Sequence, residues 1–317
     1  MFRFLSQVSH CYSRGKIFKQ PQSLQSWIGG NGVTRCLLNN QFSTSLAHQG
    51  EDAVHKKFLE TNSPESYAQF RVNLNIKKKE LLESPKRFQK ISEREQRSDI
   101  PPMTSRRFSI AKNLLEYRGV CSLTGGLDVI IYTQLLGLVQ PQTVFEFGSL
   151  FGGSALSIAD TLRLQGTKGH VYSVDLDLSL LDPRMKDLKP DNLTFIQGDM
   201  YKIEEVFPPT TLESLPHPWV LVEDAHANSL GILEHFHMFM KEGDYLVYDD
   251  SDPEMFVTNG MGWDNYPPYE PCGYDKLHIL KEFMTKYDDF YCVDSYFTDL
   301  FGYNVTNNWN GYVRRMK

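Results

Sequence analysis

Three carboxylates stand where two apolar runs end in the second half of the chain. Glu223 lies at the end of the run 218–224, and Asp249 and Asp250 close the run 243–250. Because the carboxyl ends of neighbouring parallel strands meet at one edge of a sheet, we expect these side chains to lie together. Grouped carboxylates repel one another unless a hard divalent cation binds them. The pattern predicts a site for Mg²⁺, with Ca²⁺ or Mn²⁺ as alternatives.

His226 follows Glu223 by three residues, in a loop that would face the same pocket. An imidazole in this position could accept the proton of an acceptor hydroxyl, so His226 is a candidate catalytic base. Two alternatives stay open. His226 could itself bind the metal, as in His/carboxylate iron sites, or it could be an ordinary loop histidine.

A glycine-rich turn follows another apolar run, 143–147, and leads into a helical pattern. The turn lacks both the G-x-G-x-x-G dinucleotide fingerprint and the lysine of a P-loop. Glycines let a ligand approach the backbone, and the start of the helix offers free N–H groups. An acid two residues before the first glycine disfavours a pyrophosphate and suits S-adenosylmethionine, which carries a sulfonium and an amino group. The predicted cofactor residues of this turn are Glu146, Gly148, Ser149, Gly152 and Ser154.

Two more acids end the following apolar runs and complete the predicted cofactor site. Asp175 could accept from a ribose diol, and Asp199 could accept from the adenine amino group. Glu146 could contact the methionine end of the cofactor. The alternative for each acid is to cap the helix that follows its strand.

These residues require an α/β framework, which the sequence also indicates. Apolar runs alternate with helical patterns, and this order predicts a mostly parallel, doubly wound, Rossmann-like sheet with helices on both faces. Two closing runs predict an antiparallel edge. The expected strands span 143–147, 169–177, 193–199, 218–224, 243–250, 290–297 and 310–316, and the expected helices span 107–117, 127–136, 154–160, 229–241 and 275–286.

The chain divides by composition into three parts. Residues 1–50 contain no Asp or Glu and carry five Lys or Arg, which is typical of an organellar transit peptide or of a disordered segment. We therefore expect a mitochondrial location, with the cytoplasm as the alternative. Residues 51–116 are charged and helix-prone, and we interpret them as a helical prelude or lid. Residues 117–317 form the expected catalytic domain.

Composition also limits the function classes. The formal net charge of −6 disfavours a general nucleic-acid-binding role. No run approaches the roughly 18 apolar residues of a membrane span. The five cysteines are scattered without a C-x-x-C pair, which argues against a disulfide framework or a structural zinc site. A homo-oligomer is compatible with the sequence.

An aromatic, proline-rich segment, 251–275, follows the acids of the run 243–250. Its rings Trp263, Tyr266 and Tyr269 could stack on a flat or sugar-like acceptor. The alternative is a packed surface loop.

Taken together, these motifs resemble the class I S-adenosylmethionine-dependent methyltransferases. More narrowly, residues 115–317 resemble the cephalosporin hydroxylase / rhamnosyl O-methyltransferase family. The resemblance implies a methyltransferase fold, S-adenosylmethionine as cofactor and an acceptor hydroxyl. The segments that carry it are Glu146–Ala155, Ser173–Asp177, Val222–His226, Gly243–Asp250 and Phe301–Arg315.

Metal-dependent catechol and caffeoyl-CoA O-methyltransferases share the same arrangement. By that likeness Glu223, Asp249 and Asp250 would be metal ligands, and His226 would take the place of the family's lysine base. Glu223 stands where Asp is usual, so the neighbouring Asp224 is an alternative ligand.

The leading hypothesis is therefore a metal-assisted O-methyltransferase that acts on a sugar or phenol-like hydroxyl. Two rivals remain: a metal-dependent hydroxylase, and a non-catalytic, methyltransferase-like organellar factor.

Overall fold

A computed structural model describes residues 44–112, 114–253 and 274–317. Contacts divide the chain into two units, Met1–Asn75 and Ile76–Lys317. The predicted helical N-terminal region is confirmed, since α3 (Thr44–Thr61) and α4 (Pro64–Leu82) are both helices. Most of the expected transit segment 1–50, and the whole aromatic loop around Trp263, Tyr266 and Tyr269, lie outside the described residues.

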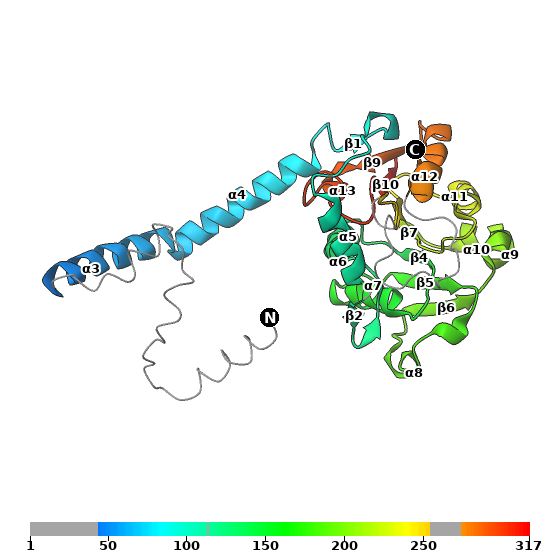
Figure 1. Ribbon diagram of the computed structural model, residues 1–317, viewed down its shortest axis with the longest axis horizontal. Coiled ribbons are helices and arrows are strands. Elements are labelled where there is room, and N and C mark those ends of the chain that lie inside the picture. Colours follow the sequence, from blue (N-terminus) through cyan, green and yellow to red (C-terminus); the bar gives the residue numbers. More distant parts are fainter. Residues whose placement is uncertain (1–43, 113, 254–273) are drawn as a thin grey trace. The chain divides into compact units, whose positions relative to one another are not determined.

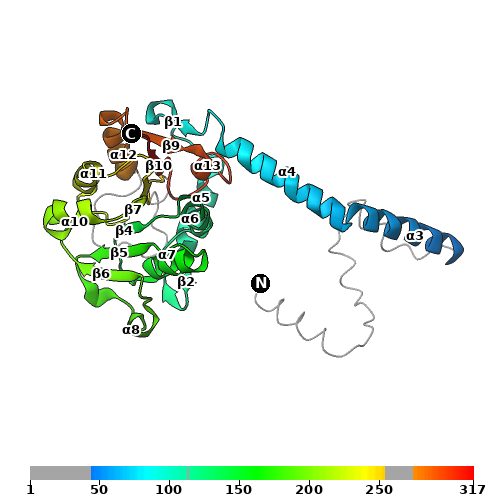
Figure 2. The same cartoon turned by 180° about the vertical axis from the view of Figure 1, so that it is seen from behind.

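The second unit is built around one mixed, eight-stranded sheet (Figures 1 and 2). Five adjacent strands at one side are parallel, and the three strands at the other side run antiparallel to their neighbours. This arrangement confirms the expected Rossmann-like sheet and its antiparallel edge. In sheet order the strands are β1 (Phe88–Gln89), β9 (Tyr291–Asp294), β10 (Tyr312–Arg315), β8 (Tyr245–Tyr248), β7 (Trp219–Glu223), β4 (Thr143–Phe147), β5 (His170–Asp175) and β6 (Leu193–Gln197).

Helices cover both faces of the sheet because successive strand residues point to opposite sides. In β4, Val144 belongs to the core that packs α6 (Gly126–Val139) and α7 (Gly153–Leu164). Its neighbour Phe145 belongs to the core of the other face, with α11 (Ser229–His237) and α12 (Tyr274–Lys286). The remaining elements are short: η2 (Ile91–Glu93), α5 (Pro102–Lys112), β2 (Glu116–Tyr117), β3 (Val120–Cys121), η3 (Leu178–Leu180), α8 (Met185–Leu188), η4 (Met200–Lys202), α9 (Ile203–Val206), α10 (Pro209–Ser214) and α13 (Ser295–Thr298).

Several predicted elements differ in their bounds from the structure, among them the helices expected at 154–160 and 229–241, and two of the differences have a local cause. The helix expected at 107–117 is α5, which begins at Pro102, because proline is well suited to the first turn of a helix. The strand expected at 290–297 ends at Asp294. There the Asp294 carboxylate accepts from the backbone N–H of Tyr296 at 3.1 Å and starts α13.

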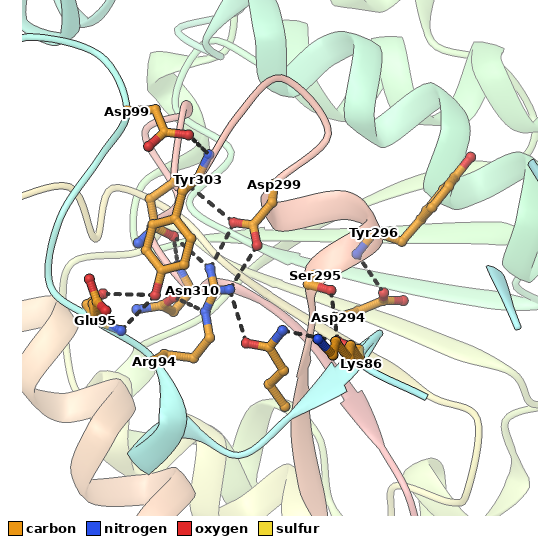
Figure 3. Close-up of polar contacts among 12 residues, drawn as sticks. Lys86, Arg94, Glu95, Asp99, Asp294, Ser295, Tyr296, Asp299, Tyr303 and Asn310 are labelled. Atoms are coloured by element: carbon orange, nitrogen blue, oxygen red, sulfur yellow. Dashed lines mark hydrogen bonds and ion pairs between the residues drawn. The ribbon is translucent and has the colours of Figure 1, made fainter. Parts of the chain in front are cut away.

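The segment before the sheet is fastened to the C-terminal part of the chain (Figure 3). The Arg94 guanidinium donates two 2.7 Å hydrogen bonds to Asp299 and one of 2.8 Å to Asn310, and it lies 4.1 Å from the centre of the Tyr303 ring. Helix α5 is fastened as well, because Ser105 donates to Asp252. Residues before the expected domain start at 117 therefore contribute β1 and α5 to the second unit.

In the described part of the chain, every helix is too short or too polar to cross a membrane.

Candidate functional site

The turn after β4 requires glycine at two positions. Gly148 has φ +102°, and a Cβ there would lie 2.5 Å from the backbone oxygen of Asp224. Gly152 has φ +87° and immediately precedes α7. Both backbone conformations disfavour residues with a side chain. The turn therefore brings bare backbone against the loop that follows β7.

Glu146 lies at the fourth position of β4 and is buried. The Ser173 hydroxyl donates to its carboxylate and lies 2.6 Å from the Ser149 hydroxyl. Burial raises the pKa of Glu146 to about 7, against the opposing effect of hydrogen bonds from Ser154 and Ser173. The structure thus brings three of the predicted cofactor residues, Glu146, Ser149 and Ser154, into one polar group.

Asp175 and Asp199 stand at the ends of β5 and β6. Asp175 accepts from the backbone N–H of Leu150 at 2.8 Å, so its carboxylate is held against the glycine turn. Asp199 accepts from the backbone N–H of Tyr201 at 2.9 Å and caps η4. Asp199 therefore makes the capping contact that is the common alternative to ligand binding.

The acidic cluster consists of Asp224, His226 and Asp250. Nε2 of His226 lies 3.2 Å from an oxygen of Asp224 and 3.4 Å from an oxygen of Asp250. One potential ligand atom from each residue lies within 4.8 Å of the others. Two acids and one histidine of the sequence prediction therefore come together.

The backbone aims these side chains. The N–H of Asp224 donates to the carbonyl of Phe147 at 2.9 Å, which continues the parallel pairing of β4 and β7. His226 and Asp250 both adopt left-handed backbone conformations, with φ of +53° and +55°. The N–H of Asp250 donates to the side-chain oxygen of Asn308 at 3.1 Å. Left-handed non-glycine residues are strained and often occur at functional sites.

The cluster alters the pKa values of its members. Burial and the charge of Lys276 lower the pKa of His226, but hydrogen bonds to Asp224 and Asp250 outweigh them and raise it to about 9. For Asp250, burial favours a higher pKa, but Lys112 and His226 outweigh it and lower the value. Without a metal ion, the cluster therefore carries a protonated imidazole between carboxylates at neutral pH.

Glu223 differs from the expectation that it is a metal ligand. Its carboxylate pairs with Nζ of Lys276 at 2.9 Å, and both side chains are fully buried. The same ammonium donates to the Glu223 carbonyl at 3.1 Å and lies 4.8 Å from the centre of the Tyr248 ring. Because neighbouring residues at a strand end point to opposite sides, Asp224 faces the cluster in place of Glu223.

Asp249 is buried next to Asp250 and lies outside the cluster of three. Burial raises its pKa well above the usual range, and the charges of Asp224 and Asp250 raise it further. Of the two acids that end the run 243–250, Asp250 is the one that faces His226.

Lys112 belongs to the site, although the sequence analysis did not predict it. Its Nζ lies 2.6 Å from both oxygens of Asp250, and the exposed fractions of the two side chains are 11% and 4%. Burial lowers the pKa of Lys112, but the charges of Asp250, Asp249 and Asp224 outweigh it, and the value is raised.

Only one of the unpredicted lysines had a signal in the sequence. Lys276 occupies the buried face of α12 at helical spacing from Leu280 and Phe283, where a lysine requires a buried partner. Lys112 and Asn308 come from segments that reach the site only through the fold, so their sequence contexts reveal nothing of it.

The cluster fits a divalent cation. Its three side chains offer ligand atoms within 4.8 Å of one another, with Nε2 of His226 at 3.2 and 3.4 Å from the two carboxylates. The two carboxylates suit Mg²⁺ or Mn²⁺, and the imidazole would also suit Fe²⁺ or Zn²⁺. The residues that would hold the ion are Asp224, His226 and Asp250.

A family model described as Rhamnosyl O-methyltransferase/CmcI matches residues 111–316. The rhamnosyl O-methyltransferase of Mycobacterium bovis (strain BCG / Pasteur 1173P2) is 27% identical over 170 residues, which cover 52% of this chain and 66% of the relative. That of Mycobacterium leprae (strain TN) is 28% identical over 148 residues, which cover 44% and 62%. The chain thus spans slightly less than two thirds of the length of these relatives.

A solved apo structure of CmcI superposes with a TM-score of 0.50 at 24% sequence identity, covering 65% of this chain and 77% of CmcI. This likeness shows the fold and agrees with the Rossmann-like methyltransferase class expected from the sequence.

Proposed function

Because the chain belongs to the rhamnosyl O-methyltransferase/CmcI family, we propose that it transfers the methyl group of S-adenosylmethionine to a hydroxyl oxygen of a small molecule. The turn after β4 would hold the cofactor. The cluster of Asp224, His226 and Asp250 would hold a divalent cation, with Mg²⁺ as the first candidate.

The observation that carries this proposal is the contact between the turn and the loop of the cluster. A Cβ at Gly148 would lie 2.5 Å from the backbone oxygen of Asp224, so the two halves of the site adjoin. A methyl donor on the turn and a hydroxyl at the cluster would therefore be neighbours. Holding two reactants side by side in the correct orientation supplies much of the rate enhancement in a direct displacement.

Each predicted cofactor residue would contact a different part of S-adenosylmethionine. Asp175, oriented by the N–H of Leu150, would accept from the ribose hydroxyls. Glu146 and its serine partners would lie near the methionine end. Asp199 would accept from the adenine amino group in addition to capping η4.

At the cluster, a bound cation would supply Lewis acidity and lower the pKa of an acceptor hydroxyl. Asp224 and Asp250 would provide its oxygen ligands. His226 has two exclusive roles, because the nitrogen that faces both carboxylates is Nε2. If Nε2 binds the cation it cannot accept the proton, and if it accepts the proton the cation rests on the carboxylates alone. The metal affinity of His226→Ala separates the two roles, because it falls only if Nε2 is a ligand.

The acceptor class follows from the relatives' name. These mycobacterial proteins are rhamnosyl O-methyltransferases, so a sugar hydroxyl is the first acceptor to test, and a phenol is the second. The hydroxylase rival needs no cofactor turn of this kind, and the organellar-factor rival needs no metal cluster.

Calorimetry with S-adenosylmethionine and S-adenosylhomocysteine, with and without Mg²⁺, tests the proposal. We expect Asp175→Asn to weaken cofactor binding at least about tenfold, the loss of one to two hydrogen bonds to a ribose. We expect Asp250→Asn to leave cofactor binding within about threefold and to remove metal binding and methyl transfer. The exposed Asp191→Asn serves as the control.

Failure of the wild-type protein to bind either cofactor would contradict the methyltransferase proposal as a whole. Full methyl transfer in EDTA would contradict the metal role alone.

A further inference from the structure

The ammonium of Lys112 lies against one of the three groups that would bind the metal. Its Nζ is 2.6 Å from both oxygens of Asp250, so it contacts that carboxylate through both oxygens. Nε2 of His226 lies 3.4 Å from one of the same oxygens. A divalent cation that used Asp250 would have to share or displace one of these two cationic groups.

Charge balance explains why a lysine stands there. Asp224 and Asp250 lie on either side of His226, and Asp249 is buried beside them. Carboxylates gathered in a poorly solvated site are unfavourable without a positive charge. The Lys112 ammonium supplies that charge, but as a single charge held on a long and flexible side chain.

We propose that Lys112 is an internal counter-cation of the candidate metal site, which holds Asp250 in the absence of a divalent cation and withdraws when one binds. This inference rests on the proposed metal-assisted function. It makes helix α5, which lies almost wholly before the region of the family match, a competitor that sets the metal affinity.

The structure indicates which partner moves. Asp250 is held by its backbone, which is left-handed and bound to Asn308. Lys112 is the last residue of α5, and its side chain is 11% exposed, so it has a route toward solvent. The helix itself stays in place because Ser105 binds Asp252 and Ser109 donates to Asn307 at 3.3 Å. Withdrawal therefore needs only a rotation of the lysine side chain.

The test compares Mn²⁺ affinity in the full chain, measured by electron paramagnetic resonance of the free ion, among four proteins. These are the wild type, Lys112→Met, Lys112→Arg and Arg107→Met. Lys112→Met removes the charge at nearly constant length, and Lys112→Arg keeps it. Arg107→Met removes a charge from an exposed position of the same helix.

We expect Lys112→Met to bind Mn²⁺ at least about tenfold more tightly than the wild type, because the ion no longer competes with an ammonium. Lys112→Arg and Arg107→Met should bind no more tightly than the wild type within about threefold. The rise in melting temperature on adding Mn²⁺ should likewise be largest for Lys112→Met.

Equal Mn²⁺ affinity in Lys112→Met and the wild type, or weaker affinity in Lys112→Met, would overturn the proposal. If Lys112→Met is unfolded in chelator, added Mn²⁺ must restore a cooperative melt, and a protein that stays unfolded in saturating Mn²⁺ also counts against it. Absence of Mn²⁺ binding in every folded variant contradicts the metal site itself, which distinguishes that failure from a failure of the lysine role.

Discussion

Two lysine–carboxylate pairs stand at the ends of the neighbouring strands β7 and β8, and their surroundings differ. Lys276 and Glu223 are fully buried, and the ammonium has further contacts with a backbone carbonyl and the Tyr248 ring. Lys112 and Asp250 lie at the edge of the cluster, where the lysine is partly exposed. The first pair is wholly removed from solvent, whereas the second adjoins the other candidate metal ligands. The same two residue types therefore serve stability in one place and a binding site in the other.

Replacement of Lys276, the fully buried lysine, should have the largest effect on stability. Lys276→Met leaves the Glu223 carboxylate buried without its cation, and we expect a loss of about 3 to 5 kcal/mol in the free energy of unfolding. Urea denaturation measures this loss. The double variant Lys276→Met/Glu223→Gln should recover much of it, because no lone charge then remains. A loss below about 1 kcal/mol in Lys276→Met alone would contradict the interpretation of Lys276 and Glu223 as a fully buried ion pair.

Glu146 provides a third case, a buried carboxylate with hydroxyl partners instead of a lysine. Its pKa is raised from 4.5 to about 7 in the folded protein. Its contribution to stability is therefore fully present below pH 4.5 and is lost as the pH rises through about 7. This loss amounts to at most about 3 kcal/mol.

We expect Glu146→Gln to remove this part of the pH dependence, as measured by urea denaturation from pH 4.5 to 8. The exposed Glu204→Gln should keep the wild-type pH dependence. An unchanged pH profile in Glu146→Gln would show that the carboxyl group is not titrating in this range.

Breaking the Lys112–Asp250 pair should cost less stability than breaking the Lys276–Glu223 pair, and the loss should depend on whether metal is bound. In chelator we expect Lys112→Met to lose about 1 to 3 kcal/mol of unfolding free energy, because His226 remains as a cationic partner of Asp250. Saturating Mg²⁺ should restore Lys112→Met and should not restore Lys276→Met. Equal responses of the two variants to Mg²⁺ would remove the contrast between the pairs.

The smallest effect on stability is expected for Asn308, whose side chain accepts from the Asp250 N–H and orients that residue. Asn308→Ala removes the acceptor of the Asp250 N–H and should cost about 1 kcal/mol of stability and lower the Mn²⁺ affinity. Asn192→Ala is the matched control, because its amide donates to the Ala159 carbonyl at 3.0 Å, away from the cluster. If both variants lose similar stability and keep the wild-type Mn²⁺ affinity, Asn308 does not orient Asp250 for metal binding.

Much of the fold follows directly from the sequence. The run Thr143–Phe147 forms a strand with the predicted bounds, and α12 begins one residue before the predicted helix 275–286. Both succeed because the apolar pattern of each segment is strong and its ends carry clear signals. The family expected from the later motifs is confirmed by the match over residues 111–316.

The segments before residue 117 were harder to place. Their charged composition is typical of a solvated prelude, yet Arg94 is buried against Asp299 and α5 sends Lys112 into the site. Composition averages over a segment, whereas a single buried arginine or lysine depends on a partner about 140 to 200 residues away. Such pairs have no local signal.

The sequence by itself determined that acids and a glycine turn gather at the carboxyl edge of a parallel sheet, because the apolar runs, the residues that end them and their alternation with helical segments are local properties. Only the tertiary structure decided which acids face one another. Glu223 and Asp224 are adjacent carboxylates, and side chains alternate between the two faces at a strand end, so one of the two had to point away. The folded chain directs Glu223 to Lys276 and Asp224 to His226, and it brings Lys112 to Asp250 from a helix that the motif does not include.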